Sequence, residues 1–329
     1  MSAVGSIVRA VRPVTDRLPF CAYNRMGFAL NRAGFDPDDR GLDGAGRVAV
    51  LTGASAGIGR ATSLALARRG FEVWMLCRDA ARGAEAQDAV ARESGSARVH
   101  LGLVDVSDLA SIRRFVAGFP ARRVDALIHN AGVLVHDRQL VAGVELTFAT
   151  HVLGPYAMTG LLLDRLMRSS DARVVFVASG GLYLQRLDLS LLDVPASRFD
   201  GVRAYANAKR AQVVLARALA DRLRDTPITF ASMHPGWVDT GTLRTALPRF
   251  HGLMRPLLRT PEQGADTVVW LASSRAGAAS PGAFWFDRRV APPHLVPWTR
   301  EAQGAPGDLV ALCESLSGVA IEATHRRAA

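Results

Sequence analysis

Lysine, tyrosine and cysteine are scarce in this sequence of 329 residues. Of the 40 residues that are lysine or arginine, only Lys209 is a lysine, and there are four tyrosines and three cysteines. Cys21, Cys77 and Cys313 lie far apart and form no C-x-x-C pair, which argues against a disulfide framework and a cysteine zinc site. We therefore expect a protein of the reducing cytoplasm without a bound metal.

Long apolar runs are also missing, so the sequence predicts no membrane-spanning helix. The first twenty residues, MSAVGSIVRAVRPVTDRLPF, are interrupted by Arg9, Arg12, Pro13 and Arg17 before an apolar signal-peptide core can form. We predict no signal peptide. Hydrophobic residues make up 49% of the chain and charged residues 21%, which is an ordinary composition for a globular protein with a sizeable core.

The charge balance is basic, with a formal net charge of +10. Its arginines are scattered, and arginine pairs such as Arg68–Arg69 and Arg288–Arg289 lie in separate segments. This distribution favours a solvated, arginine-biased surface over a single face that binds nucleic acid. The basic and partly apolar first 30 residues leave open a weak contact with an anionic membrane surface.

Beyond residue 46, short apolar runs alternate with segments of helical periodicity. The runs that we predict as strands are residues 47–53, 71–77, 99–106, 124–130, 173–179, 228–234 and 283–287. Strands that are apolar on both faces and alternate with helices, such as residues 59–70 and 211–223, indicate right-handed βαβ units. The predicted fold class is α/β, a single doubly wound, Rossmann-type parallel sheet of about seven strands with helices on both faces.

We divide the chain into three parts. Residues 1–46 form an N-terminal extension and linker, because they end in the Pro/Asp/Gly-rich stretch FDPDDRGLDGAG. Residues 47–300 form the Rossmann-type domain. Residues 301–329 form a C-terminal helix, predicted over residues 307–318, and a tail.

A glycine-rich turn follows the first predicted strand and opens the first helix. Gly53, Gly57 and Gly59 have the spacing T-G-x-x-x-G-x-G within VLTGASAGIGRAT. Glycine allows the backbone to turn tightly and to approach a pyrophosphate, whose charge then lies at the helix N-terminus. Because this turn lies between a strand and a helix, it predicts a dinucleotide site.

The end of the second predicted strand indicates which dinucleotide is bound. A basic residue there accepts the 2′-phosphate of NADP, whereas an acidic one bonds the 2′-hydroxyl of NAD. Arg78 stands at this position, where a guanidinium can form paired hydrogen bonds with a phosphate, although Asp79 follows it. We favour NADP(H).

Five motifs stand in the order that is typical of one enzyme family: the Thr52–Gly59 turn, HNAG at 129–132, Ser179, Tyr205-x-x-x-Lys209 and HPGWVDT at 234–240. Together they resemble the short-chain dehydrogenases/reductases. Within this family, the sequence most resembles the branch that is similar to dehydrogenase/reductase SDR family member 12. Stretches such as SGGLYLQRL and FDGVRAYANAKRAQVVL carry this closer resemblance. The resemblance covers about residues 20–320.

The resemblance implies hydride transfer between a nicotinamide and a carbonyl or alcohol carbon. Tyr205 would protonate the carbonyl oxygen, and Ser179 would hold and polarise that oxygen. Lys209 lies one helical turn after Tyr205, on the same face, where a cation lowers the pKa of a phenol. It would also bond the nicotinamide ribose, which a compact ammonium can do and a broad guanidinium cannot.

Further residues follow from the same resemblance. Asn130 and Gly132 would pack behind the nicotinamide, Asp105 would contact the adenine amine, and Thr240 would reach the carboxamide or phosphate side. The implied cofactor-binding residues are Thr52, Gly53, Ser55, Gly57, Ile58, Gly59, Arg78, Asp105, Asn130, Gly132, Tyr205, Lys209, Pro235, Gly236, Val238 and Thr240.

The sequence departs from the family at two places. His129 replaces the first asparagine of N-N-A-G, and His151, in FATHVLGPY, replaces the asparagine that supports the family's proton relay. We predict that His151 is neutral near pH 7 and that its Nδ1 makes one of the bracing hydrogen bonds, so that the relay survives. The catalytic set would be Ser179, Tyr205, Lys209 and His151.

The segment after Thr240, GTLRTALPRFHGLMRPLLRT, is unusually apolar for a loop. In the resembling enzymes it covers the substrate, which favours a small apolar carbonyl or alcohol of lipid, retinoid-like or steroid-like character. Packing on the sheet or on a partner subunit would explain the same residues. The alternative function is an NADP-binding sensor or pseudoenzyme, which would have no chemical reason to keep Ser179, Tyr205 and Lys209 together.

Overall fold

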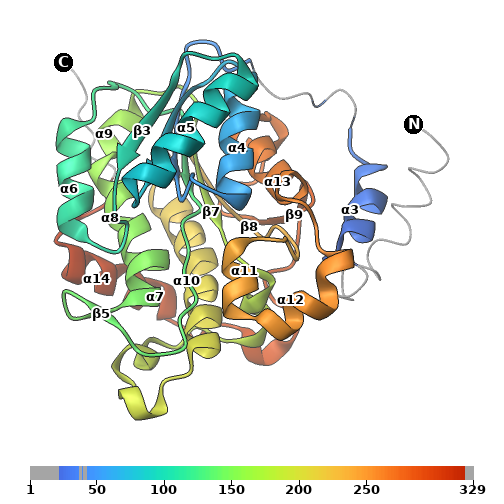
Figure 1. Ribbon diagram of the computed structural model, residues 1–329. Coiled ribbons are helices and arrows are strands. Elements are labelled where there is room, and N and C mark those ends of the chain that lie inside the picture. The colour runs from blue at the N-terminus through green and yellow to red at the C-terminus, as the bar shows by residue number, and fades with distance from the viewer. Residues whose placement is uncertain (1–21, 37–38, 40–42, 323–329) are drawn as a thin grey trace.

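The computed structural model describes residues 22–36, 39 and 43–322 (Figure 1). Its centre is an eight-stranded sheet in the order β10-β9-β8-β7-β4-β1-β2-β3. The strands are β1 (Val48–Thr52), β2 (Glu72–Cys77), β3 (Val99–Leu103), β4 (Ala126–His129), β7 (Ala172–Val177), β8 (Ile228–Met233), β9 (Phe284–Phe286) and β10 (Arg289–Val290).

Each of the seven predicted strands overlaps one of these strands, which confirms the predicted fold class. All neighbouring strands pair in parallel except β9 and β10, which form a short antiparallel hairpin. The eighth strand was not predicted because it is only two residues long. A second hairpin, β5 (Leu140–Val141) and β6 (Val144–Glu145), stands apart from the sheet.

Two hydrophobic cores lie on the two faces of the sheet. Successive strand residues alternate between them, so that Val50 belongs to one core and Leu51 to the other. Helices α4 (Gly57–Arg68), α5 (Ala80–Ser94) and α13 (Pro261–Ser273) cover the face of Leu51. The face of Val50 is covered by α6 (Leu109–Gly118), α8 (Gly154–Leu161), α10 (Gly201–Arg222) and α14 (Ala305–Ser317), as Figure 1 shows.

None of the other helices of the described chain has more than eight residues. They are α3 (Arg25–Arg32), α7 (Leu146–Phe148), α9 (Leu163–Met167), α11 (Gly241–Ala246) and α12 (Pro248–Met254). Helix α14 agrees with the helix predicted over residues 307–318. Among the described residues, no helix combines the length and the apolar character that crossing a membrane requires.

Part of the predicted N-terminal extension packs against the domain. Ala22, Tyr23 and Phe28 are buried, and the Asn24 side chain caps the N-terminus of α3 by accepting bonds from the next backbone N–H groups. Residues 1–21, 37–38 and 40–42 of the extension lie outside the described residues. Residues 22–35 therefore pack against the domain next to α12 (Figure 1).

Candidate active site

The four candidate catalytic residues come from three elements that meet at the carboxyl end of the sheet. Ser179 follows β7, Tyr205 and Lys209 lie on α10, and His151 lies in a π-helical turn, η1 (Ala149–Leu153). The Ser179 hydroxyl and the Tyr205 side chain both border Gly181, and Ser179 lowers the pKa of the Tyr205 phenol. The rings of His151 and Tyr205 meet edge to face, with centroids 5.4 Å apart. The structure therefore brings all four residues together.

Tyr205 is half-buried, and burial raises the pKa of its phenol, while the nearby Ser179 hydroxyl acts in the opposite direction. The sequence predicted that the Lys209 ammonium would lower this pKa. In this structure the Lys209 Nζ lies over the Tyr205 ring, 5.5 Å from its centroid. Burial outweighs the effect of the Ser179 hydroxyl, so the pKa of Tyr205 is raised and not lowered as predicted.

Lys209 is buried, and its ammonium has two hydrogen-bond acceptors. Nζ donates to the Val177 carbonyl oxygen at 2.8 Å and to the Gln212 Oε1 at 3.0 Å. Burial disfavours the charged form and lowers the pKa of Lys209 to about 7. The only lysine of the chain can thus gain or lose a proton close to neutral pH.

This pKa predicts how stability depends on pH. An unfolded lysine has a pKa of about 10.4, so between pH 7 and 9 the unfolded chain binds more protons at position 209 than the folded chain. The free energy of unfolding should then rise with pH, by up to about 1.4 kcal/mol per pH unit from this residue. We expect the rise to be absent in Lys209→Met, as measured by urea unfolding at pH 7, 8 and 9. An Arg92→Met control on the exposed face of α5 should keep it, and equal slopes in Lys209→Met and the unmutated protein would contradict the assignment.

His151 is fully buried and braces the turn after β4. Its Nε2 lies 3.1 Å from the Val133 N and 2.9 Å from the Val133 carbonyl oxygen, so one of these bonds forms in each neutral tautomer. Burial and the nearby Lys209 charge hold the pKa of His151 well below its ordinary value, in agreement with the predicted neutral state. The bracing atom is Nε2, however, and not Nδ1 as predicted.

His151 bonds through Nε2 and not through Nδ1 because its imidazole ring extends past Gly132. A Cβ on Gly132 would lie only 2.7 Å from the His151 Cε1, so the missing side chain leaves the space that the ring fills. The ring therefore reaches Val133 with its far nitrogen. Nδ1 is buried and has no hydrogen-bond partner among the described residues.

The glycine turn has the shape that a pyrophosphate requires. Gly53 and Gly57 have φ of +66° and +54°, and a Cβ on Gly59 would lie 2.2 Å from the Gly53 carbonyl oxygen. Ala56, the residue before α4, makes no side-chain cap. The first N–H groups of α4 are thus free of a side-chain acceptor, so these residues fit an anionic group at the helix N-terminus.

Thr52 and Asn130 hold the glycine turn in place. The Asn130 Nδ2 donates to the carbonyl oxygens of Thr52 and Gly53, and the Thr52 hydroxyl accepts from the Asn130 and Ala131 N–H groups. The Asn130 side chain thus holds the glycine turn, and Gly132 borders His151. The packing of Asn130 and Gly132 behind the nicotinamide stays a prediction.

The expected adenosine end is formed by Arg78 and Asp105. The Arg78 side chain is 64% exposed, and its Nη1 lies 3.9 Å from the Asp105 Oδ2. The Asp79 carboxylate caps α5 by accepting from the Arg82 N–H at 2.9 Å. Asp79 therefore has a structural partner, and Arg78 is left to face solvent at the end of β2. Burial raises the pKa of the Cys77 thiol at the end of this strand, and the nearby Ser55 side chain acts in the opposite direction.

The other predicted cofactor residues lie on α4 or in the segment after β8. Thr240 faces Gly57, where a Cβ would lie 3.3 Å from the Thr240 Cγ2, and it caps α11. Ile58 and Val238 both pack on Gly264. Pro235 and Gly236 form the loop after β8, in which Gly236 has a φ of +79°.

The apolar segment after Thr240 forms helices and not a loop. It contains α11, α12 and the 3-10 turn η5 (Arg255–Leu257). His136, from the loop after β4, bonds the Ala246 carbonyl oxygen at 3.0 Å, so α11 is tied to the side of the site that holds His151. Met254 is buried and Leu253 is exposed.

Two residues that support the site were not predicted from the sequence. Arg210 is fully buried and donates to the carbonyl oxygens of Leu182, Gln185 and Pro293, which holds the loop after Ser179. The ring of Tyr23 lies against Gly180, where a Cβ would be 3.0 Å away. In a chain with 39 arginines, no sequence signal separates Arg210 from surface arginines.

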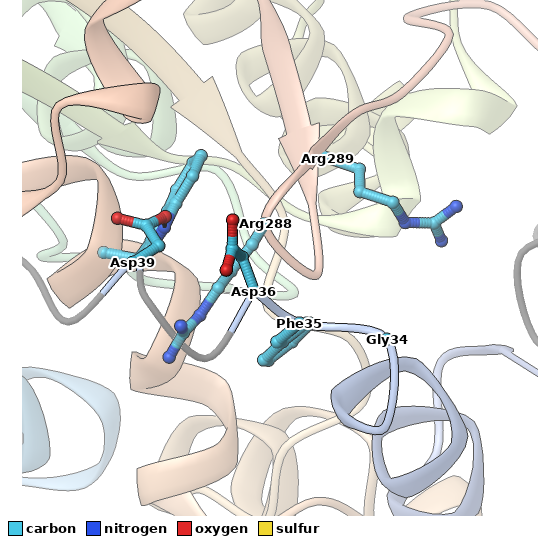
Figure 2. A pocket seen from close by; sticks show the side chains of 7 residues that line it. Gly34, Phe35, Asp36, Asp39, Arg288 and Arg289 are labelled. Atoms are coloured by element: carbon cyan, nitrogen blue, oxygen red, sulfur yellow. Dashed lines mark hydrogen bonds between the residues drawn. The ribbon is translucent and has the colours of Figure 1, made fainter. Parts of the chain in front are cut away.

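A separate cavity of about 300 Å³ lies elsewhere in the molecule (Figure 2). It is lined by Gly34, Phe35, Asp36, Asp39, Trp270, Arg288 and Arg289. Arg288 lies over the Phe35 ring, and in Figure 2 the Arg289 side chain extends away from Asp39. No predicted site residue lines this cavity, so it is distinct from the candidate active site.

Comparisons with known proteins agree with this geometry. Residues 47–189 match the family model of the short chain dehydrogenases. Dehydrogenase/reductase SDR family member 12 from Homo sapiens is 40% identical over 301 residues, which cover 91% of this chain and 94% of that protein. Retinol dehydrogenase 12 from Bos taurus is 35% identical over 248 residues, or 74% of this chain and 78% of that protein.

A solved structure has the same fold. Pseudomonas aeruginosa RhlG, in an active-site complex with NADP, superposes with a TM-score of 0.60 at 26% identity, over 73% of this chain and 94% of that one. The sequence match, the sheet order and the meeting of Ser179, Tyr205 and Lys209 lead to the same result. The chain belongs to the short-chain dehydrogenase/reductase family, close to the branch of family member 12.

Proposed function

We propose that this protein is an NADP(H)-dependent oxidoreductase that interconverts an apolar carbonyl compound and its alcohol. The observation that carries the proposal is the buried lysine, one turn after a tyrosine that lies beside Ser179. A buried ammonium destabilises the fold, so a chain that otherwise uses arginine has a reason to keep it only if it performs a task.

Each side chain of the site would have its own role in the reaction. A bound nicotinamide would supply or accept the hydride. The Ser179 hydroxyl and the Tyr205 phenol are adjacent, so both can donate hydrogen bonds to one carbonyl oxygen, and Tyr205 delivers the proton. Lys209, whose pKa is about 7, can then return a proton to the phenol side of the site near neutral pH. His151, neutral and fixed to Val133, keeps the turn beside them in place.

Arg78 supports NADP(H) as the cofactor. It is exposed at the end of β2, and its acidic neighbour Asp79 is bound to the N-terminus of α5. A guanidinium in this position can bond the 2′-phosphate, which NADH lacks.

Loss of this guanidinium should weaken NADPH binding selectively. We expect Arg78→Ala to reduce NADPH affinity by about 1.5–3 kcal/mol, the range for a hydrogen bond to a charged group. NADH affinity should stay the same, and so should NADPH affinity in the control Arg92→Ala on α5. Isothermal titration of both cofactors measures these effects. Equal affinities of the unmutated protein for NADPH and NADH would contradict the proposed role of Arg78.

The helices after Thr240 and the relatives support an apolar substrate. Helices α11 and α12 carry Leu243, Phe250 and Leu253 next to the predicted cofactor residues, and one family relative is a retinol dehydrogenase. The test is NADPH oxidation with a panel of apolar aldehydes and ketones, including retinal and a steroid ketone, against a sugar aldehyde. Turnover of the sugar alone would contradict the proposed substrate class.

A further inference from the structure

Helix α3 has apolar side chains on two faces, and only one of them is used by the fold. Its inner face buries Gly27 and Phe28. Its outer face exposes apolar residues at the spacing i, i+3 and i+4, namely Met26, Ala29 and Leu30, and the C-cap residue Ala33 at i+7 is also exposed. Met26 is 62% exposed and Leu30 is 58% exposed. This periodicity is typical of an amphipathic helix that has a second apolar environment to contact.

Helix α12 adds a further apolar side chain beside α3. Leu253 is 80% exposed, which is more than any other large apolar residue of the described chain. The Arg25 Nη1 donates to the Pro256 carbonyl oxygen at 2.9 Å, so α3 and the turn after α12 are in contact, as Figure 1 also shows. We call the exposed residues Met26, Ala29, Leu30 and Leu253 the α3–α12 face.

Buried contacts hold together the segments that flank these two helices. Arg259, directly after the turn η5, is buried, pairs with Asp287 at 2.6 Å and donates to the Ala22 and Asn24 carbonyl oxygens. The Trp237 N–H donates to the Tyr23 carbonyl oxygen at 2.7 Å. The ring of Trp237 also packs edge to face on Tyr23. The α3–α12 face therefore needs no rearrangement to present its side chains together.

The two segments that form this face carry charge of one sign. Residues 22–35 and 241–260 contain six arginines and no aspartate or glutamate. Two of these arginines are paired with acidic residues from elsewhere, Arg259 with Asp287 and Arg244 with Asp239. The other four, Arg25, Arg32, Arg249 and Arg255, are exposed. Exposed apolar side chains bordered by arginine complement a surface that is apolar inside and anionic at its boundary.

We propose that the α3–α12 face docks on an anionic lipid bilayer, with Met26, Leu30 and Leu253 entering the boundary between headgroups and acyl chains. A second copy of the chain fits less well, because it would bring its own arginines against these arginines. Nucleic acid would engage the arginines but would leave the apolar side chains without a partner. This docking does not depend on the proposed reaction.

The α3–α12 face lies near the candidate active site, so docking would bring the active site close to the bilayer. The ring of Tyr23 lies against Gly180, next to Ser179, and α12 belongs to the segment that follows Thr240. An apolar substrate dissolved in the bilayer would thus meet the active site from the docked side. This second step rests on the proposed function, whereas the docking itself is tested without substrate.

The test is sedimentation of the full-length protein with sucrose-loaded vesicles of phosphatidylcholine containing 30 mol% phosphatidylserine, or of phosphatidylcholine alone. We expect the double variant Leu30→Glu/Leu253→Glu to lower the partition coefficient on the anionic vesicles by at least about tenfold, because two apolar contacts are replaced by charges of the wrong sign. The matched control is Leu140→Glu on β5. The Leu140 side chain is 51% exposed, and β5 lies on the side of the molecule opposite α3 in Figure 1. It should bind like the unmutated protein.

A second pair of variants separates insertion from general attraction. Arg32→Gln/Arg249→Gln should also weaken binding to the anionic vesicles by about tenfold, and the control Arg92→Gln on α5 should weaken it less. Circular dichroism and thermal melting verify that each variant folds. Equal binding to both vesicle types, or full binding by Leu30→Glu/Leu253→Glu, would overturn the proposal. So would a concentration-dependent dimer that the same double variant abolishes, since the face would then be a contact between two copies.

Discussion

Replacing Tyr205 by phenylalanine is expected to lower kcat by at least about a hundredfold, the scale of a lost general acid. The same loss is expected for Lys209→Arg, although the charge is kept. Lys209 is buried with two acceptors at 2.8 and 3.0 Å, and a planar guanidinium with five donors cannot be satisfied in the same space. Steady-state NADPH oxidation with the best aldehyde of the substrate panel measures both effects.

Tyr183 offers a matched control for the tyrosine. It lies in the loop after Ser179, and its hydroxyl donates to the Pro292 carbonyl oxygen, away from the Ser179 hydroxyl. Tyr183→Phe should therefore keep most of the kcat. Near-normal activity in Lys209→Arg would show that the chain does not keep this lysine for catalysis.

The second large effect is expected at His151. His151→Ala removes the hydrogen bond between the His151 Nε2 and the Val133 backbone. We therefore expect kcat to fall by about tenfold or more, while NADPH binding persists. His151→Asn restores the amide that is typical of the family and can bond the same backbone groups. Its kcat should equal or exceed that of the unmutated protein. Turnover and cofactor titration of the two variants, measured side by side, distinguish these outcomes.

The same pair of variants decides between the enzyme and the alternative of an inactive NADP-binding sensor. If the unmutated protein oxidises no NADPH with any carbonyl compound while His151→Asn does, the histidine has silenced the site. The protein would then be a sensor that keeps the fold and the cofactor. Activity in both proteins supports a working relay in which the imidazole acts as a brace.

The sequence predicted most of what lies at strand ends. Parallel strands end at one edge of the sheet, so motifs that follow β1, β4, β7 and β8 have to meet there, whatever the details of packing. The i and i+4 spacing placed Tyr205 and Lys209 on one face of α10 in the same way. These features depend on local sequence and on the periodicity of helices and strands.

Features that depend on distant packing were not predictable. Arg259 and Asn24 are 235 residues apart in sequence, and only the fold shows that a guanidinium holds the N-terminal segment beside Gly180. The atom through which His151 acts depends on the missing side chain of Gly132, which a single sequence does not connect to residue 151. The pKa of Tyr205 also differs from the prediction, because burial raises it by more than the neighbouring Ser179 hydroxyl lowers it, and burial depends on the packing of distant segments.

The central claim is that this chain transfers hydride between NADP(H) and an apolar carbonyl carbon through Tyr205 and Lys209. The most direct measurement uses NADPH carrying deuterium at one face of nicotinamide C4, with each face labelled in turn, and detects the label in the alcohol product by mass spectrometry. We predict that the unmutated protein transfers one deuterium from one face to the carbonyl carbon, and that Tyr205→Phe does so at least about a hundredfold more slowly while still binding NADPH. Absence of label in the product from both faces, with every aldehyde and ketone of the panel, would contradict the claim.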